Sequence, residues 1–276
     1  MTQWLPVLFL IVSFVYMMIP VILSRVFGLG VYKKGIQAQQ AEVAFTFDDG
    51  PDPRYTPELL DLLKEYDVLA TFFVLGSKAE QYPHLIRRIH DEGHQVGIHN
   101  YIHKCNLLIF PWKIKRQHIN RTADIIEGII GERPSSYRPP WGVLSMGELF
   151  WLRKSYDIVL WSVMGWDWKR QENSEKLIDR LLSKIQPGSI VLLHDSGDTA
   201  GADEDAPKQM LEGLRIVLQE LKHKQYAYVR TDKLLKKRVV KGYKIDQNIH
   251  ATQHSNRPDS LTGSIRFRVV ADSDNG

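Results

Sequence analysis

Short apolar runs alternate with amphipathic segments along most of the chain from about residue 43 onward. The apolar runs have the length and composition of strands, and they fall at residues 43–47, 71–75, 95–98, 158–162, 189–193 and 226–229. Segments with apolar residues at helical spacing lie between them, in a helix that starts at Thr56 and near residues 82–92, 112–130, 174–185 and 207–222. This alternation predicts an α/β fold with a parallel sheet, arranged as a barrel or as a doubly wound sheet.

The N-terminal segment has a different pattern, because residues 4–23 carry no charge. About 20 apolar residues are enough to cross a bilayer. A cleaved signal peptide normally has a basic start and a small-residue cleavage site, and this segment has neither. We therefore expect a membrane anchor and linker at residues 1–30, one catalytic-type domain at 40–235, and a polar, basic tail or partial module at 236–276.

Composition narrows the functional classes only slightly. The 276 residues are 43% hydrophobic and 25% charged, with a net charge of +4, which is ordinary for a globular protein. Basic residues are not interleaved with aromatic ones in a stripe, so no nucleic-acid partner is expected. A single cysteine, Cys105, excludes an intrachain disulfide. The oligomeric state is left open.

Candidate chemical groups follow the predicted strands. Asp48 and Asp49 come directly after the first strand, and His99 and His103 follow the third. In a barrel and in a doubly wound sheet alike, chemistry gathers at the carboxyl ends of the strands. A histidine pair with a carboxylate is a common metal-ligand set. The alternatives are an acidic turn at Asp48–Asp49, followed by Gly50, and a chance pair of surface histidines.

Two further segments suit catalysis or sugar binding. Arg138 precedes two prolines, which stiffen the turn and could aim the guanidinium at a carboxylate, although a plain proline turn has the same sequence. His194 ends the apolar run 190–193, and imidazole transfers protons well near neutral pH. The tryptophans within residues 161–168 can stack on sugar rings or belong to the core.

Taken in this order, the segments resemble the polysaccharide deacetylases, the carbohydrate esterases of family 4 with a NodB-homology domain. The resemblance covers roughly residues 42–235 and implies a distorted (β/α)₇ barrel, here preceded by a transmembrane helix. It implies that Asp48 is the catalytic base. It also implies that Asp49, His99 and His103 bind the metal ion, and that Arg138 orients the base.

The remaining roles concern the acid and the substrate. The resemblance implies that His194 is the general acid and that Leu192 lines the acetate pocket. The main chain near Trp141 would contribute to an oxyanion hole. We expect Trp141, Leu192, Trp166 and Asp167 to contact the substrate.

Two positions depart from the family pattern. Asn100 stands where the family commonly has Ser or Thr, and it can make the same kind of local hydrogen bond. Met164 stands where the family often has an aspartate that tunes the catalytic histidine. A thioether cannot hold an imidazolium, so the pKa of His194 is expected to be lower than with a carboxylate partner, unless Asp167 or Asp195 takes that place.

The function we predict is metal-dependent hydrolysis of N-acetyl groups on amino-sugar polymers, either peptidoglycan or a chitin-like glycan. One divalent ion, zinc with cobalt or manganese as alternatives, would polarise the amide and carry the water that acts as nucleophile. Two alternatives stay open: a glycan-binding protein with weakened catalysis, and a deacetylase that acts on a lipid-linked amino sugar at the membrane.

Two indications disagree about the side of the membrane on which the catalytic domain lies. Arg25, Lys33 and Lys34 follow the apolar segment and, by the positive-inside rule, favour a cytoplasmic domain. The family's usual work on wall polymers favours the outside. We expect a single-pass protein with an extracytoplasmic catalytic domain.

Overall fold

The computed structural model describes residues 5–35, 41–169 and 173–236. Residues 237–276, most of the predicted tail, lie outside the described residues.

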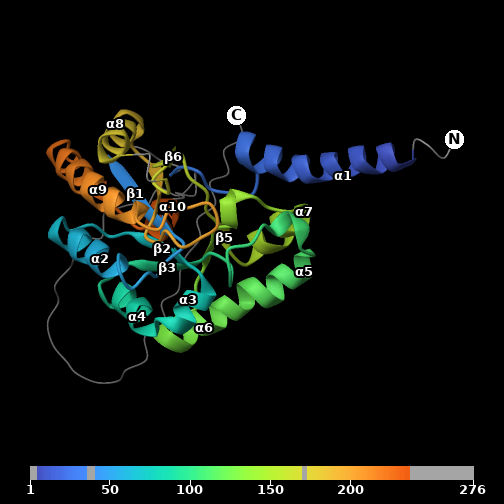
Figure 1. Ribbon diagram of the computed structural model, residues 1–276, viewed down its shortest axis with the longest axis horizontal. Coiled ribbons are helices and arrows are strands. Elements are labelled where there is room, and N and C mark those ends of the chain that lie inside the picture. Colours follow the sequence, from blue (N-terminus) through green and yellow to red (C-terminus); the bar gives the residue numbers. More distant parts are fainter. Residues whose placement is uncertain (1–4, 36–40, 170–172, 237–276) are drawn as a thin grey trace, which may run out of the picture. The chain divides into compact units, whose positions relative to one another are not determined.

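A single parallel sheet forms the centre of the described part of the chain (Figure 1). Its strand order is β5-β4-β3-β2-β1-β7-β6, and β8 pairs with β1. The strands are β1 (Glu42–Asp48), β2 (Thr71–Val74), β3 (Gln95–Ile98), β4 (Ser136–Tyr137), β5 (Asp157–Ile158), β6 (Val163–Met164), β7 (Ser189–His194) and β8 (Ala227–Tyr228). The α/β prediction and its parallel sheet are therefore confirmed.

Helices pack around the sheet, with α8 against α9, α9 against α2, α2 against α4 and α4 against α6 (Figure 1). The α-helices are α1 (Leu5–Val21), α2 (Thr56–Glu65), α3 (Gly76–Gln81), α4 (Pro83–Asp91), α5 (Pro111–Lys113), α6 (Arg121–Ile130), α7 (Met146–Trp151), α8 (Ser174–Lys184), α9 (Ala206–His223) and α10 (Thr231–Lys236). The other helical turns are η2 (Ile22–Val26), η3 (Asn106–Leu108), η4 (Ile114–Asn120), η5 (Pro140–Gly142) and η6 (Leu152–Lys154).

The central strands are buried on both faces, which explains their continuous apolar runs. Every residue of β1 is buried, and so is every residue of β2 and β3. Parallel strands covered by helices on both sides have this composition. Phe47 and Phe72 pack together on one face with ring centroids 5.2 Å apart. A rigid core therefore fixes the strand ends at which the chemical groups lie.

Two predicted details differ from the structure. The strand predicted at 158–162 overlaps the short β5 only at Ile158, and neither β4 nor β6, which begins just after that range, was predicted. β4, β5 and β6 contain two residues each, too few for a recognisable apolar run. The sheet path ends at β5 on one side and β6 on the other, so it forms an incomplete barrel.

The linker after α1 and η2 is tied to the domain at this opening. Tyr32 N–H donates to the Ile158 carbonyl at 2.8 Å, and Leu160 N–H donates to the Tyr32 carbonyl at 2.7 Å. Gly35 N–H donates to the Gly188 carbonyl at 2.8 Å. The linker therefore makes backbone hydrogen bonds both to the end of β5 and to the residue just before β7.

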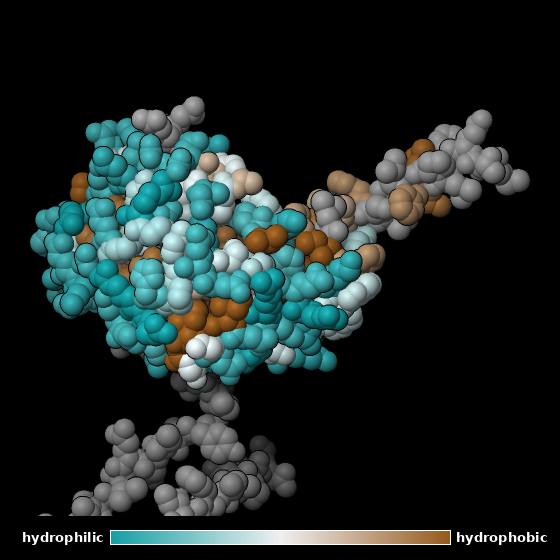
Figure 2. Space-filling view, turned by 60° about the horizontal axis from the view of Figure 1, so that its bottom comes forward, coloured by the Kyte–Doolittle hydropathy of each residue, from teal (hydrophilic) through white to brown (hydrophobic). Residues whose placement is uncertain are grey.

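One described helix is long and apolar enough to cross a membrane. The stretch Val7–Val26 has a mean hydropathy of 2.6, and its described side chains are mostly exposed. Figure 2 shows hydrophobic residues along this helix and a mainly hydrophilic surface on the rest of that face. A membrane anchor and a signal sequence both have these properties.

Candidate active site

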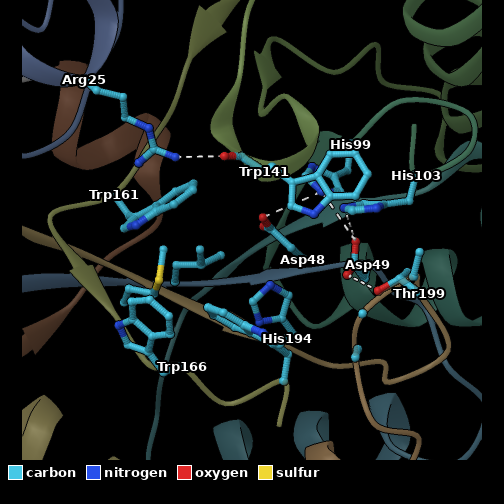
Figure 3. Close-up of a pocket in the computed structure, with 16 residues that line it drawn as sticks. Arg25, Asp48, Asp49, His99, His103, Trp141, Trp161, Trp166, His194 and Thr199 are labelled. Atoms are coloured by element: carbon cyan, nitrogen blue, oxygen red, sulfur yellow. Dashed lines mark hydrogen bonds and ion pairs between the residues drawn. The ribbon is translucent and has the colours of Figure 1, made fainter. Parts of the chain in front are cut away.

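The carboxyl ends of β1, β3 and β7 surround a cavity of about 310 Å³ (Figure 3). Asp48 is the last residue of β1, and Asp49 has a left-handed backbone with φ of 74°. This reversal interrupts the alternation of side chains along the strand. As a result both adjacent carboxylates line the same cavity and both are buried.

Asp49, His99 and His103 present one possible ligand atom each, and these atoms lie within 4.8 Å of one another. Asp49 Oδ1 is 3.4 Å from His99 Nε2 and 3.5 Å from His103 Nε2 (Figure 3). His99 comes from the end of β3, and His103 from the loop that follows it. The structure thus brings together the three predicted ligands.

The chemistry of this donor set fits a divalent metal ion. Asp49 Oδ1 is buried without a hydrogen-bond partner among the described residues, although it faces both imidazoles. His99 Nδ1 lies 2.8 Å from the Arg138 carbonyl oxygen, to which a protonated Nδ1 donates, leaving the Nε2 lone pair free for a metal. Burial lowers the pKa of His99 to about 3, so the ring is neutral at pH 7. Thr199 Oγ1 donates to Asp49 Oδ2 at 2.8 Å and holds the carboxylate in place.

Arg138 is fully buried and bonded to Asp48. Its Nη1 donates to Asp48 Oδ1 and to Thr46 Oγ1, both at 2.7 Å. Nε and Nη2 donate to the carbonyls of Val159 and Leu160. Burial raises the pKa of Asp48, and the charge of Arg138 opposes that rise only in part. The guanidinium therefore orients a carboxylate that binds a proton more tightly than usual.

His194 lies beside Asp48 on the adjacent strand, because the two residues are register partners on β7 and β1. Asp167 Oδ1 lies 3.1 Å from His194 Nδ1, and Asp167 Oδ2 accepts a hydrogen bond from His194 N–H at 2.7 Å. Burial alone would lower the pKa of His194, but the Asp167 carboxylate raises it to about 9. Asp195, the other candidate partner, instead accepts a hydrogen bond from Thr56.

The expected loss of carboxylate tuning at His194 is therefore not found. Met164 does leave its position without a carboxylate, but Asp167 fills the role from the loop after β6, where Trp166 has a positive φ of 62°. The side chain of Asp167 is only 1% exposed and lies against His194. This placement suits orientation of His194 better than the contact with substrate that the sequence suggested.

The Asp167→Asn variant should lose activity on the alkaline side. Without the carboxylate, burial should lower the pKa of His194 below about 9. A general acid works only below its own pKa, so the alkaline limb of the pH–rate profile should move to lower pH. The measurement is kcat as a function of pH. An alkaline limb at the same pH as in wild type would show that a group other than His194 determines that limb. Asp179→Asn, on α8, serves as a matched control.

Aromatic and aliphatic side chains line the cavity around these groups. Trp141 has its ring centroid 4.2 Å from that of His103, and it is 47% exposed. Trp166 is 50% exposed and stacks on Trp168, whose ring meets His194 edge-on. Leu192 also lines the cavity. Exposed indoles beside a polar pocket suit the apolar faces of sugar rings.

Among the lining residues that sequence reasoning missed, Arg25 and Thr199 have side chains that make polar contacts at the site. Arg25 lies on η2, at the end of the apolar stretch Val7–Val26, and Nη2 donates to the Trp141 carbonyl at 2.9 Å. The two residues are 116 positions apart in sequence. No local pattern predicts such a contact.

The sequence is similar to those of known proteins. Residues 35–151 match the sequence model described as Polysaccharide deacetylase. A peptidoglycan-N-acetylglucosamine deacetylase of Bacillus cereus is 32% identical over 200 residues, which are 70% of this chain and 88% of that protein. The chain belongs to the polysaccharide deacetylase family. The fold and family that the motifs implied are thus confirmed.

Other polysaccharide deacetylases extend the comparison. A second B. cereus protein of the same description is 38% identical over 64% of this chain and 66% of its own length. The peptidoglycan-N-acetylmuramic acid deacetylase PdaC of Bacillus subtilis is 37% identical over 70% of this chain, but the match spans only 42% of PdaC. The crystal structure of the Bc1960 peptidoglycan N-acetylglucosamine deacetylase has a TM-score of 0.70 and 33% identity, covering 77% of this chain and 96% of that one.

Proposed function

We propose that this protein is a metal-dependent N-deacetylase of peptidoglycan, releasing acetate from its acetamido sugars. One observation supports the proposal: a carboxylate, three candidate metal ligands and an imidazole of raised pKa line one cavity at the carboxyl ends of strands of the same sheet. The relatives named as peptidoglycan deacetylases support the choice of polymer.

The metal ion would be held by Asp49, His99 and His103, and zinc fits two imidazoles with one carboxylate, as cobalt and manganese also do. When bound, such an ion supplies Lewis-acid polarisation of the amide carbonyl and of a water molecule. Thr199 and the Arg138 carbonyl keep two of the ligands in the orientation that this requires.

Asp48 and His194 then divide the proton transfers. Asp48 is the base: its Oδ1 is fixed by Arg138, and its raised pKa favours removal of a proton from the attacking water. His194 is the acid: Asp167 keeps it protonated at neutral pH, so it can protonate the amine as the C–N bond breaks. The products are acetate and a free amine on the sugar.

An acetate-release panel tests the function. We expect the protein with its metal ion to release acetate from peptidoglycan faster than from chitooligosaccharides, and at most weakly from acetylated xylan. The reason is that the relatives are named for peptidoglycan, whose sugars carry acetamido groups, whereas xylan has no acetamido sugar for the cavity to select. No acetate from any amino-sugar polymer would contradict the proposal and favour the alternative of a glycan-binding protein.

A further inference from the structure

The cavity holds a cation that the proposed reaction does not use. Arg25 lines the cavity and is half-buried, and Figure 3 shows it on the opposite side from Asp49 and His103. Its guanidinium carbon lies 4.0 Å from the centroid of the Trp161 ring. Arg25 therefore belongs to the wall of the site, although it lies outside the residues that match the family.

Arg25 is built into this position. Nη2 donates to the Trp141 carbonyl at 2.9 Å, and the Arg25 carbonyl accepts a hydrogen bond from Lys33 Nζ at 2.6 Å. Gly142 has a φ of 64°, and a β-carbon at that position would collide with the Arg25 guanidinium. The backbone bonds of Tyr32 and Gly35 fix the linker that follows. A flexible surface arginine would have none of these constraints.

The charge of Arg25 is not neutralised within the described residues. Arg138 approaches the same indole, with its guanidinium carbon 5.7 Å from the Trp161 centroid, but Arg138 is paired with Asp48. For Arg25 the one side-chain bond in the described part of the chain goes to a neutral carbonyl. Several of its five N–H donors are thus available to a ligand, and a guanidinium is well suited to carboxylate or phosphate.

We propose that Arg25 forms an anion subsite, which selects amino-sugar glycans carrying a carboxylate or phosphate close to the acetamido group that is cleaved. The inference rests on the proposed deacetylase function and adds a substrate class to it. The metal ligands and Asp48 act on the acetamido group, while Arg25 binds the oxyanion across the cavity. Free lactyl groups of N-acetylmuramic acid supply a carboxylate, and a pyrophosphoryl-linked sugar supplies a phosphate.

The test compares charged and neutral forms of one substrate with the full chain in detergent. The first pair is peptide-free peptidoglycan strands and the same strands with their carboxylates converted to methylamides. The second pair is N-acetylglucosaminyl pyrophosphoryl lipid and an alkyl N-acetylglucosaminide. We expect wild type to prefer the charged member of one pair, which identifies the oxyanion. Arg25→Gln should lower that preference, measured as a ratio of kcat/KM, about tenfold.

Control variants distinguish anion binding by Arg25 from structural support of the Trp141 loop. Arg25→Lys keeps the charge and should retain part of the preference, whereas Lys154→Gln removes an exposed cation on η6 and should retain all of it. An equal loss on charged and neutral substrates would overturn the proposal and leave Arg25 as a support for Trp141. A wild type without preference in either pair would also overturn it.

A binding measurement keeps this result distinct from failure of the proposed function. Calorimetric titration measures binding without turnover. The charged strands and the methylamide strands are each titrated into the Asp48→Asn protein and into the Asp48→Asn, Arg25→Gln double variant. Tighter binding of the charged strands that Arg25→Gln abolishes supports the anion subsite even if wild type releases no acetate. Equal binding of both strands to the Asp48→Asn protein contradicts the subsite.

Discussion

Asp48→Asn should lower kcat for acetate release by about a thousandfold, because general-base catalysis by a positioned side chain contributes about 10²–10⁴-fold. The amide of Asn can still accept the hydrogen bond of Arg138 but cannot take a proton from water. Arg138 would then be buried without a counter-charge, so the free energy of unfolding should also fall, by about 3 kcal/mol. Single-turnover acetate release and urea unfolding measure the two effects.

The matched control for this change is Asp61→Asn, which alters an exposed carboxylate on α2 that pairs with Arg88. Exposed ion pairs contribute little to stability, so both kcat and unfolding should stay close to wild type. Undiminished acetate release by Asp48→Asn would remove Asp48 from the role of base. A loss of bound metal in this variant would instead show that Asp48 is a ligand.

Removal of the metal ion should abolish acetate release, and added zinc, cobalt or manganese should restore it. The orphaned, buried Asp49 Oδ1 facing two imidazoles is the physical basis of this expectation. Elemental analysis of the purified protein should find about one ion per chain, in keeping with a single three-ligand site. Full activity of the metal-free protein would contradict the mechanism.

Substitution of the ligands tests the same site without a chelator. Asp49→Asn and His99→Ala should each reduce bound metal at least about tenfold, since every ligand of a three-residue site is needed. His84→Ala, an exposed histidine on α4, is the control and should leave the metal content unchanged. Retention of metal by both ligand variants would place the site elsewhere.

Most of the fold could be predicted because the long strands are buried on both faces. β1, β2, β3 and β7 are mainly apolar, and Asp48, His99 and His194 lie at or just after the ends of β1, β3 and β7. The order of these groups along the chain was therefore enough to identify the family. Two-residue strands such as β4 and β6 depend on neighbours that are distant in sequence, and no local pattern marks them.

The partner of His194 shows where a comparison of motifs is insufficient. A motif specifies which residue stands at each position of the sequence, and position 164 holds Met164 in place of the family's carboxylate. Hydrogen bonding depends on where the backbone places a side chain, and the positive φ of Trp166 accompanies a turn from which Asp167 reaches both the ring and the N–H of His194. Arg25 was missed for a similar reason, since only the folded chain brings η2 next to Trp141.

The pairing of β1 with β7 has a consequence for how such an enzyme can diversify. Asp48 and His194 are held opposite each other by main-chain hydrogen bonds of the central sheet. Trp141, Trp166 and Thr199, by contrast, lie outside the long strands, and Arg25 comes from η2. We therefore expect that lengthening or exchanging those outer segments would change which glycan is accepted without altering the spacing of the proposed base and acid. Chimeras that carry these segments from another deacetylase should therefore exchange substrate preference while keeping the same chemistry.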